Sequence, residues 1–444
     1  MTNDKKIVVR FPPSPTGLFH MGNARTLLFN YLFAKKNNGR IVLRLEDTDK
    51  ERSREEYSQD IIDNLKWLGI EPDSLVAIRQ SERGPVYKKY LEKMISEGKA
   101  YFSKETVVEE GQRDQVIRFK NPNKKIVFND LIRGDIEFDT TELKDFIIAK
   151  SLEEPVYHLA VVVDDYEMGV SHIIRGDDGI SNTPRQILIQ EAIGAPRPVY
   201  AHLPLILTQD RTKLSKRKHG EKVSVTFYRN AGYLPEAVVN FLALIGWNPG
   251  DEREIFSKEE LIKEFSLERI QKSAGIFNVE RLDWYNKEYI KKLSPKDLEI
   301  RVSDELGTQD EIFIKKITPI VIDRINKFSD IKKIKKEELS FFFNEPEYAK
   351  EMLLWKKDPD MEKTKKHLQE VVKLVSLLSE NKFNQDKIKE TVWNYAEKEG
   401  KGNVLWPMRV ALTGMEKSPD PFAVAGVLGK EKTIKRLIYA IEKI

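Results

Sequence analysis

The amino-terminal half of the chain alternates short apolar runs with segments in which apolar residues recur every three or four positions. Short runs predict buried strands, and the longer spacing predicts helices with one apolar face. The expected elements are strands at 7–11, 41–45, 173–174 and 203–207 and helices over 53–68 and 182–193. This alternation favours an α/β fold, with a mostly parallel sheet covered by helices.

Terminal signals accompany both predicted helices. Ser53 and Glu56 have the spacing of a capping box, and Gly194 directly follows the second helix. We therefore expect the first helix to begin at Ser53 and the second to end at Ile193.

The pattern changes twice further along the chain. From Arg83 to Pro155, β-prone pieces such as QVIRFK, KKIVFNDLIRGDIEFD and DFIIAK interrupt the alternation. Beyond Gly220 the strand signals fade, and helical patterns follow one another to the carboxyl terminus. The sequence thus predicts an interrupted α/β domain followed by an all-α second half.

The loop after the first strand is rich in residues that prevent regular structure, namely Pro12, Pro13, Pro15 and Gly17. Helical spacing of apolar residues then resumes and continues to Gly39. The unpaired N–H groups and the dipole of such a helix start stabilise an anion. A strand, a loop and a helix in this order predict a phosphate site.

Two polar side chains lie on the first turn of this helix. His20 and Asn23 are three residues apart on one face, and Gly22 adds no side chain between them. A motif this short is also compatible with a histidine that only caps the helix and a glycine that only packs.

A basic loop, TQDRTKLSKRKHG, follows the β-prone segment HLPLILT. In it Lys213, Lys216, Arg217 and Lys218 surround the small Ser215. Basic runs are commonly solvated surface segments. A short basic run directly after a strand can also stabilise the negative charge of a leaving pyrophosphate. Together with the proline-rich loop, it favours a nucleoside triphosphate site.

These two segments carry a resemblance to a known family. PSPTGLFHMGN resembles the HIGH signature of class I aminoacyl-tRNA synthetases, and KLSKR resembles their KMSKS signature. RLEDTD, YHLAVVVDD and IIRGDDGISNTPRQ are similar to blocks of bacterial glutamyl-tRNA synthetases, and GNVLWPMRVALTG is similar to their anticodon-binding end. The resemblance runs over nearly the whole chain. It implies ATP-dependent activation of L-glutamate to glutamyl-adenylate and its transfer to the 3′ terminal adenosine of tRNA(Glu).

The resemblance also implies a domain order. It predicts a Rossmann-type catalytic domain at 1–82 and 156–220, an α+β connective insertion for the tRNA acceptor end at 83–155, a helical stem-contact domain at 221–300 and an all-helical anticodon-binding domain at 301–444. The insertion is shorter than usual in the family and lacks the cysteine pairs that hold zinc in some members. We therefore expect no zinc or other metal there.

ATP is implied as co-substrate, with Mg²⁺ carried on its phosphates. The glutamate carboxylate must approach the negatively charged phosphates of ATP. The reaction therefore needs positioned cations and hydrogen-bond donors. The residues implied as catalytic are His20, Asn23, Lys213 and Lys216. The implied ATP site comprises Pro13, Ser14, Thr16, Gly17, His20, Gly22, Asn23, Lys213, Ser215, Lys216 and Arg217.

The glutamate site follows from positions in the matched motifs. The resemblance places Arg10 and Tyr157 at the side-chain carboxylate, Ser14 and Glu46 at the α-ammonium, and Arg175 at the α-carboxylate. Arginine can hold a carboxylate with two hydrogen bonds, and neutral glutamine would leave Arg10 unpaired. In the alternative interpretation both arginines pair with structural acids and Glu46 caps a neighbour.

Composition limits the partners. The 444 residues include 75 basic and 71 acidic side chains, which gives a formal net charge of +4. Overall charge is therefore too small to hold tRNA, and we expect tRNA to bind local basic patches. The candidates for RNA contact are Arg118, Lys120, Lys124, Lys125, Arg133, Trp355, Trp393 and Trp406, for which solvated charge and buried tryptophan are the ordinary alternatives.

The chain has no cysteine, no apolar signal core after MTNDKK and no apolar run of membrane-spanning length. We expect a cytoplasmic protein without a membrane partner, and the family tendency is monomeric.

Three alternatives stay open at this stage. A glutaminyl-tRNA synthetase shares the catalytic domain but ends in β-barrels. A truncated relative that glutamylates a modified base lacks an anticodon domain, and a non-catalytic tRNA-binding relative keeps the fold without the activity. The resemblance also leaves open tRNA(Gln) as a second substrate, because discriminating members read the wobble base with an arginine near the position of Ser340.

Overall fold

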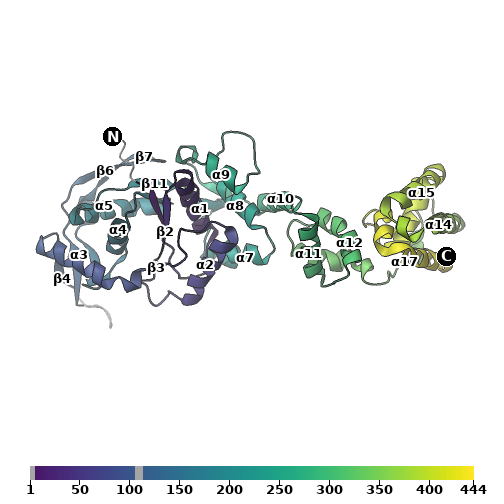
Figure 1. The fold of residues 1–444 in the computed structure, drawn as a ribbon, viewed down its shortest axis with the longest axis horizontal. Coiled ribbons are helices and arrows are strands. Elements are labelled where there is room, and N and C mark those ends of the chain that lie inside the picture. Colours follow the sequence, from purple (N-terminus) through teal and green to yellow (C-terminus); the bar gives the residue numbers. More distant parts are fainter. Residues whose placement is uncertain (1–5, 106–113) are drawn as a thin grey trace. The chain divides into compact units, whose positions relative to one another are not determined.

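The computed structural model describes residues 6–105 and 114–444. The chain forms two compact units, an amino-terminal unit at 1–286 and a carboxyl-terminal unit at 287–444. Figure 1 shows strands and helices together in the first unit and helices in the second.

The amino-terminal unit is built on parallel strands. One sheet pairs β1 (Val8–Phe11) with β2 (Arg40–Leu45), and β2 with β3 (Ile78–Arg79). β10 (His172–Gly176) pairs in parallel with β11 (Val199–Leu203), and Ser171 hydrogen-bonds to Val8, which places β10 beside β1. All four residues of β1 are buried, as expected of a strand covered on both faces. The predicted parallel sheet is confirmed.

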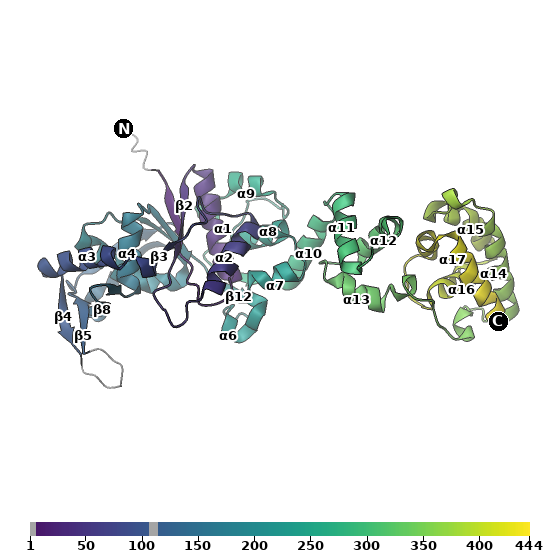
Figure 2. The same cartoon turned by 60° about the horizontal axis from the view of Figure 1, so that its bottom comes forward.

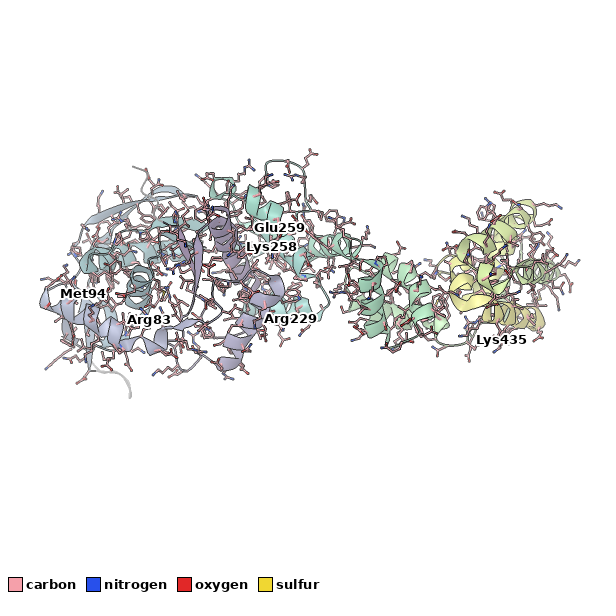
Figure 3. All side chains as sticks on the ribbon, viewed as in Figure 1. Arg83, Met94, Arg229, Lys258, Glu259 and Lys435 are labelled. Atoms are coloured by element: carbon pink, nitrogen blue, oxygen red, sulfur yellow. The ribbon has the colours of Figure 1, made fainter. Side chains whose placement is uncertain are left out.

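Helices cover this sheet. α1 (Met21–Lys36) packs against β1, β2 and β10, while α4 (Tyr157–Glu167) packs against α5 (Thr183–Ile193). α2 (Glu55–Leu68) is followed by its C-cap Gly69, whose carbonyl accepts a hydrogen bond from Lys258 of α9 (Lys258–Glu264), a residue labelled in Figure 3.

The insertion contributes to two sheets. β4 (Ala100–Lys104), β5 (Gln115–Phe119), β8 (Phe146–Ser151) and β9 (Glu154–Pro155) form an antiparallel sheet beside α3 (Gly84–Ser96). β6 (Lys125–Asp130) and β7 (Gly134–Asp139) instead extend the β10–β11 sheet, since Asp130 of β6 pairs with Tyr200 of β11. The insertion therefore shares a sheet with β10 and β11, which follow it in the chain.

The rest of this unit follows β12 (Ile206–Thr208). Figure 2 shows the short α6 (Lys216–His219) following β12. The remaining helices are α7 (Val225–Asn230), α8 (Pro235–Leu244) and α10 (Val279–Ile290), the last of which runs across the boundary between the units.

The carboxyl-terminal unit contains helices and no strand among residues 287–444. They are α11 (Pro295–Leu306), α12 (Glu311–Arg324), α13 (Asp330–Glu337), α14 (Met361–Ser376), α15 (Gln385–Glu399), α16 (Lys401–Thr413) and α17 (Pro421–Lys443). The prediction of an all-α carboxyl-terminal half is confirmed for residues 287–444.

Three local predictions were wrong. The strand expected at 203–207 is interrupted, because β11 ends at Leu203 and β12 begins at Ile206. Pro204 between them has no N–H to donate to a ladder. In the segment expected to be helical, β13 (Gly275–Phe277) pairs with β12.

The predicted capping box of α2 is the third error. Arg54 is the N-cap, without a side-chain cap, and the Ser53 hydroxyl is buried without a hydrogen-bond partner in the described structure. The N–H of Arg54 donates to the carbonyl of Pro15 at 3.1 Å, so a long-range bond keeps the chain extended where local spacing favoured a helix.

Candidate active site

A cavity of about 620 Å³ lies between the loop after β1, the first turn of α1 and the chain around β12. The predicted site residues that line it are Pro13, Ser14, Thr16, Gly17, His20, Gly22, Asn23, Glu46, Tyr157, Arg175, Lys213 and Ser215. Arg10 is not among the lining residues, and the side chains of Lys216 and Arg217 lie outside the described part of the structure. The two sequence motifs therefore meet at one cavity.

His20 starts α1 and shapes its first turn. Its backbone is extended, and its Nδ1 accepts the N–H of Gly22 at 2.8 Å. A neutral imidazole carries one proton, so this proton lies on Nε2. A Cβ at position 22 would lie only 3.1 Å from Nδ1, so any side chain there would press on the imidazole. The first turn carries no acidic side chain, so its N–H groups and the imidazole suit phosphate oxygens.

Two segments far apart in sequence are joined beside this helix start. The N–H of Val225 donates to the carbonyl of Phe19 at 2.8 Å. Asp60 of α2 accepts from the N–H of Phe19 at 2.6 Å and from the hydroxyl of Thr226. The start of α1 is thus held against the chain that follows the basic loop.

The basic loop presents Lys213 to the cavity. Lys213 Nζ lies 3.2 Å from Asp178 Oδ2, and both side chains are largely exposed. Leu214, the next residue, is buried and anchors the loop. Because an exposed ion pair contributes little free energy, Lys213 can exchange Asp178 for a phosphate oxygen at small cost.

A buried ionic cluster comprises Arg10, Arg44, Glu46, Asp164 and Asp165. Arg44 lies 2.7 Å from Asp165 and 3.3 Å from Glu46, and Arg10 lies 3.4 Å from Asp165. Burial raises the pKa of Glu46 against the opposing charges of Arg44 and Arg10. Burial also opposes ionisation of Asp165, but Arg10 and Arg44 outweigh it and lower its pKa. Asp165 is therefore held in its charged form more firmly than Glu46.

Arg10, which is 2% exposed, thus pairs with a structural acid, one of the two interpretations given above. Its contact with the glutamate side chain stays a prediction. Glu46 and Tyr157 line the cavity, and Tyr157 is exposed.

Arg175 of β10 reaches the cavity with uncharged hydrogen-bond partners only. It donates to Gly179 O at 3.0 Å, Thr183 Oγ1 at 2.8 Å and His202 Nε2 at 3.1 Å. Its Nη1 is buried and has no hydrogen-bond partner in the described structure. Burial lowers the pKa of Arg175, and a buried cation without an acidic hydrogen-bond partner favours an anionic ligand.

Sequence reasoning missed Asp165, Asp130 and His202. Two adjacent carboxylates in the apolar segment YHLAVVVDD were a usable signal for Asp165, because buried carboxylates require cationic partners. Asp130 and His202 gave no local signal, since their hydrogen bond joins residues 72 positions apart.

The candidate RNA contacts of the insertion are mostly engaged within the protein. Ion pairs join Arg118 to Glu105, Lys124 to Glu191, Lys125 to Glu137 and Arg133 to Asp177. Their contact with phosphates stays a prediction.

The three candidate tryptophans of the second unit are half-buried. Trp355 and Trp406 have ring centres 5.3 Å apart, and Trp406 Nε1 donates to Met352 O. Trp393 has Lys401 Nζ 4.3 Å from its ring centre. Base stacking on these rings stays a prediction.

Within residues 6–105 and 114–444, no group of three or more His, Asp or Glu side chains could hold a metal ion. None of the described helices combines the length and apolar character needed to cross a bilayer.

Comparison with known proteins extends these findings. The chain matches the family model "tRNA synthetases class I (E and Q), catalytic domain" over residues 6–110 and 103–284, and "Anticodon binding domain" over 277–441. It is 40% identical to "Glutamate--tRNA ligase" from Aquifex aeolicus, with 99% of each chain covered, and 40% identical to that from Sulfurihydrogenibium sp., with 97% and 98% covered.

Among solved structures, the chain is similar to a glutamate tRNA ligase from Elizabethkingia meningosepticum in complex with its amino acid. The TM-score is 0.85 at 32% identity, with 99% of each chain covered.

Proposed function

This chain belongs to the class I glutamyl- and glutaminyl-tRNA synthetase family, and we propose that it joins L-glutamate to tRNA(Glu) with consumption of ATP. The observation that carries the proposal is the single cavity lined by His20 and Asn23 from the first motif, Lys213 from the second, and Arg175. Phosphate-binding and carboxylate-binding groups then lie within reach of one bound adenylate.

Each group has a part in activation. The start of α1, with His20 and Asn23, holds the ATP phosphates, and Lys213 with Lys216 closes over them as pyrophosphate leaves. Mg²⁺ carried by ATP would offset part of the phosphate charge, while the start of α1 and Lys213 would hold the phosphates themselves. Ser14 and Glu46 hold the α-ammonium, Tyr157 and Arg10 the side-chain carboxylate, and Arg175 the α-carboxylate. The remaining predicted ATP contacts are Pro13, Thr16, Gly17, Gly22, Ser215 and Arg217.

The second step, transfer of glutamate to tRNA, depends on how the tRNA is positioned. The terminal hydroxyl of tRNA attacks the mixed anhydride, while residues 83–155 hold the acceptor end, 221–300 contact the stem and 301–444 contact the anticodon. Zinc has no part in this proposal, and the chain acts as a cytoplasmic monomer.

The alternatives are weaker. A glutaminyl-tRNA synthetase is expected to end in β-barrels, whereas residues 287–444 are helical. A truncated, base-modifying relative would lack this helical unit, and a non-catalytic relative would not require both motifs at one cavity.

The deciding experiment is a charging assay with purified chain, ATP and tRNA(Glu). We expect glutamate to be attached and glutamine to be rejected, because a neutral amide gains less than a carboxylate from the cationic side-chain site proposed at Arg10. Lys216→Ala is expected to lose charging and keep tRNA binding. Binding of tRNA without charging by the unaltered protein would support the non-catalytic relative, and attachment of glutamine would support the glutaminyl enzyme.

We also propose that tRNA(Gln) is charged. Ser340 begins a short helical turn at 340–342 and offers no cation near the position where discriminating members carry an arginine. An arginine-to-base contact is worth about 1–3 kcal/mol of discrimination, so Ser340→Arg is expected to lower charging of tRNA(Gln) relative to tRNA(Glu) by about 5- to 150-fold. Ser340→Ala is the control. Failure of the unaltered protein to charge purified tRNA(Gln) would refute this proposal.

A further inference from the structure

A chain of buried side chains leads from the insertion to Arg175. Asp130, the last residue of β6, is 1% exposed, and His202 of β11 is fully buried. Asp130 Oδ2 lies 2.6 Å from His202 Nδ1, and His202 Nε2 lies 3.1 Å from Arg175 Nε. The three residues form an unbroken hydrogen-bonded series that ends at the cavity.

The protonation states along this series are set by the neighbours. Burial opposes the charge of Asp130, but hydrogen bonds from His202, Arg133 and Ile132 hold its pKa below the ordinary value. Burial lowers the pKa of His202, and nearby Arg175 lowers it further, against the effect of Asp130. A carboxylate therefore faces a neutral imidazole.

This pairing selects one tautomer of His202. An ionised carboxylate only accepts hydrogen bonds, so the imidazole proton lies on Nδ1 and is donated to Asp130. Nε2 is then an acceptor, and it receives the N–H of Arg175 Nε. The opposite tautomer would place two donors face to face.

The rest of the guanidinium is fixed in the same way. Nη2 donates to Gly179 O and Thr183 Oγ1, while Nη1 is buried without a partner among the described residues. A Cβ at Gly179 would lie 2.4 Å from Arg175 Nε, so the guanidinium packs directly on this backbone. One nitrogen of an otherwise saturated, buried cation is left for a ligand.

We propose that Asp130 and His202 are positioning residues that hold Arg175 with Nη1 available to the α-carboxylate of glutamate. The proposal rests on the proposed function, since it takes Arg175 as the contact to that carboxylate. Asp130 and His202 touch neither substrate nor reacting atoms and act through the orientation of Arg175. Because Asp130 ends a strand of the insertion, the acceptor-binding segment supplies part of the amino-acid site.

Asp130→Asn is the main test because it preserves shape and can reverse the tautomer. The amide N–H₂ would donate to Nδ1, move the imidazole proton to Nε2 and oppose Arg175. In the charging assay we expect the KM for glutamate to rise about 10- to 100-fold, as for loss of a hydrogen bond to a charged group. The KM for ATP should stay unchanged, and calorimetry should report the same weakening of glutamate binding.

A matched pair at position 202 separates positioning from packing. In His202→Gln the amide oxygen can reach the place of Nε2 and accept from Arg175, so the KM for glutamate should stay close to that of the unaltered protein. In His202→Asn the shorter side chain can meet Asp130 but not Arg175, so the KM should rise as in Asp130→Asn. If Asp130→Asn does not fold, this pair decides the proposal, and equal KM values for Gln and Asn would overturn it.

Arg175→Met tests the contact of Arg175 with the substrate separately from the positioning role of Asp130 and His202, because it removes the charge and keeps a side chain of similar length. If Arg175→Met leaves glutamate binding unchanged, Arg175 does not contact the substrate, and both the site assignment and the positioning role are wrong. If Arg175→Met weakens glutamate binding while Asp130→Asn and His202→Asn do not, only the positioning role is wrong.

Discussion

Replacement of His20 by asparagine is expected to lower kcat/KM for glutamate charging by about 10²- to 10³-fold, the usual effect of removing one positioned donor to developing charge. His20 does two things at the start of α1. Its Nδ1 accepts the N–H of Gly22, and its Nε2–H is the group that we propose donates to an ATP phosphate. Asparagine is among the best N-cap residues, so His20→Asn keeps the first function and removes the second.

Two companion variants separate stability from chemistry. His20→Ala loses the cap as well and should lower the free energy of unfolding by about 1 kcal/mol more than His20→Asn. Ser257→Ala removes the side-chain cap of α9 in the same unit, away from the cavity lining, and should cost about 1 kcal/mol without changing charging. Steady-state charging and urea unfolding measure both quantities. Full activity of His20→Asn would show that His20 acts only as a cap.

The architecture could be predicted because its signals are local. The alternation of apolar runs and helical spacing identified β1, β2, β10 and α5, and Gly194 ended α5 where expected, in the left-handed conformation. The same local reasoning failed at Arg54, where a hydrogen bond to Pro15 decides the helix start. Periodicity carries no information about such long-range bonds.

The candidate site was predictable to the extent that it lies on contiguous motifs. His20, Asn23, Lys213 and Ser215 were identified from two short segments, and one cavity brings them together. Asp130 and His202 are single residues from different segments, whose pairing depends on β6 lying beside β11. Only the folded sheet makes that juxtaposition visible.

The buried ionic cluster is expected to be sensitive to the loss of its central cation. Arg44 is fully buried, and its guanidinium faces Asp165 at 2.7 Å, Glu46 at 3.3 Å and Asp164 at 3.7 Å. Its removal leaves buried carboxylates without their shared cation, and breaking a buried pair in this way costs about 3–5 kcal/mol. We expect Arg44→Met, which keeps the side-chain volume roughly constant, to lower the free energy of unfolding by that amount.

An exposed pair supplies the matched control. Arg79, whose side chain is 29% exposed, lies 2.7 Å from the exposed Glu55 and 3.7 Å from Asp47, and Arg79→Met should cost less than Arg44→Met, about 1 kcal/mol, because water screens much of the lost charge. The pH dependence gives a second readout. The lowered pKa of Asp165 contributes stability above its unfolded pKa of about 3.8, and this contribution is lost as pH falls through the lower folded value. In Arg44→Met the pKa of Asp165 should rise, so acid unfolding should begin at higher pH than in the Arg79→Met protein. Equal denaturant midpoints and equal acid transitions for the two variants would mean that the cluster does not hold the fold together.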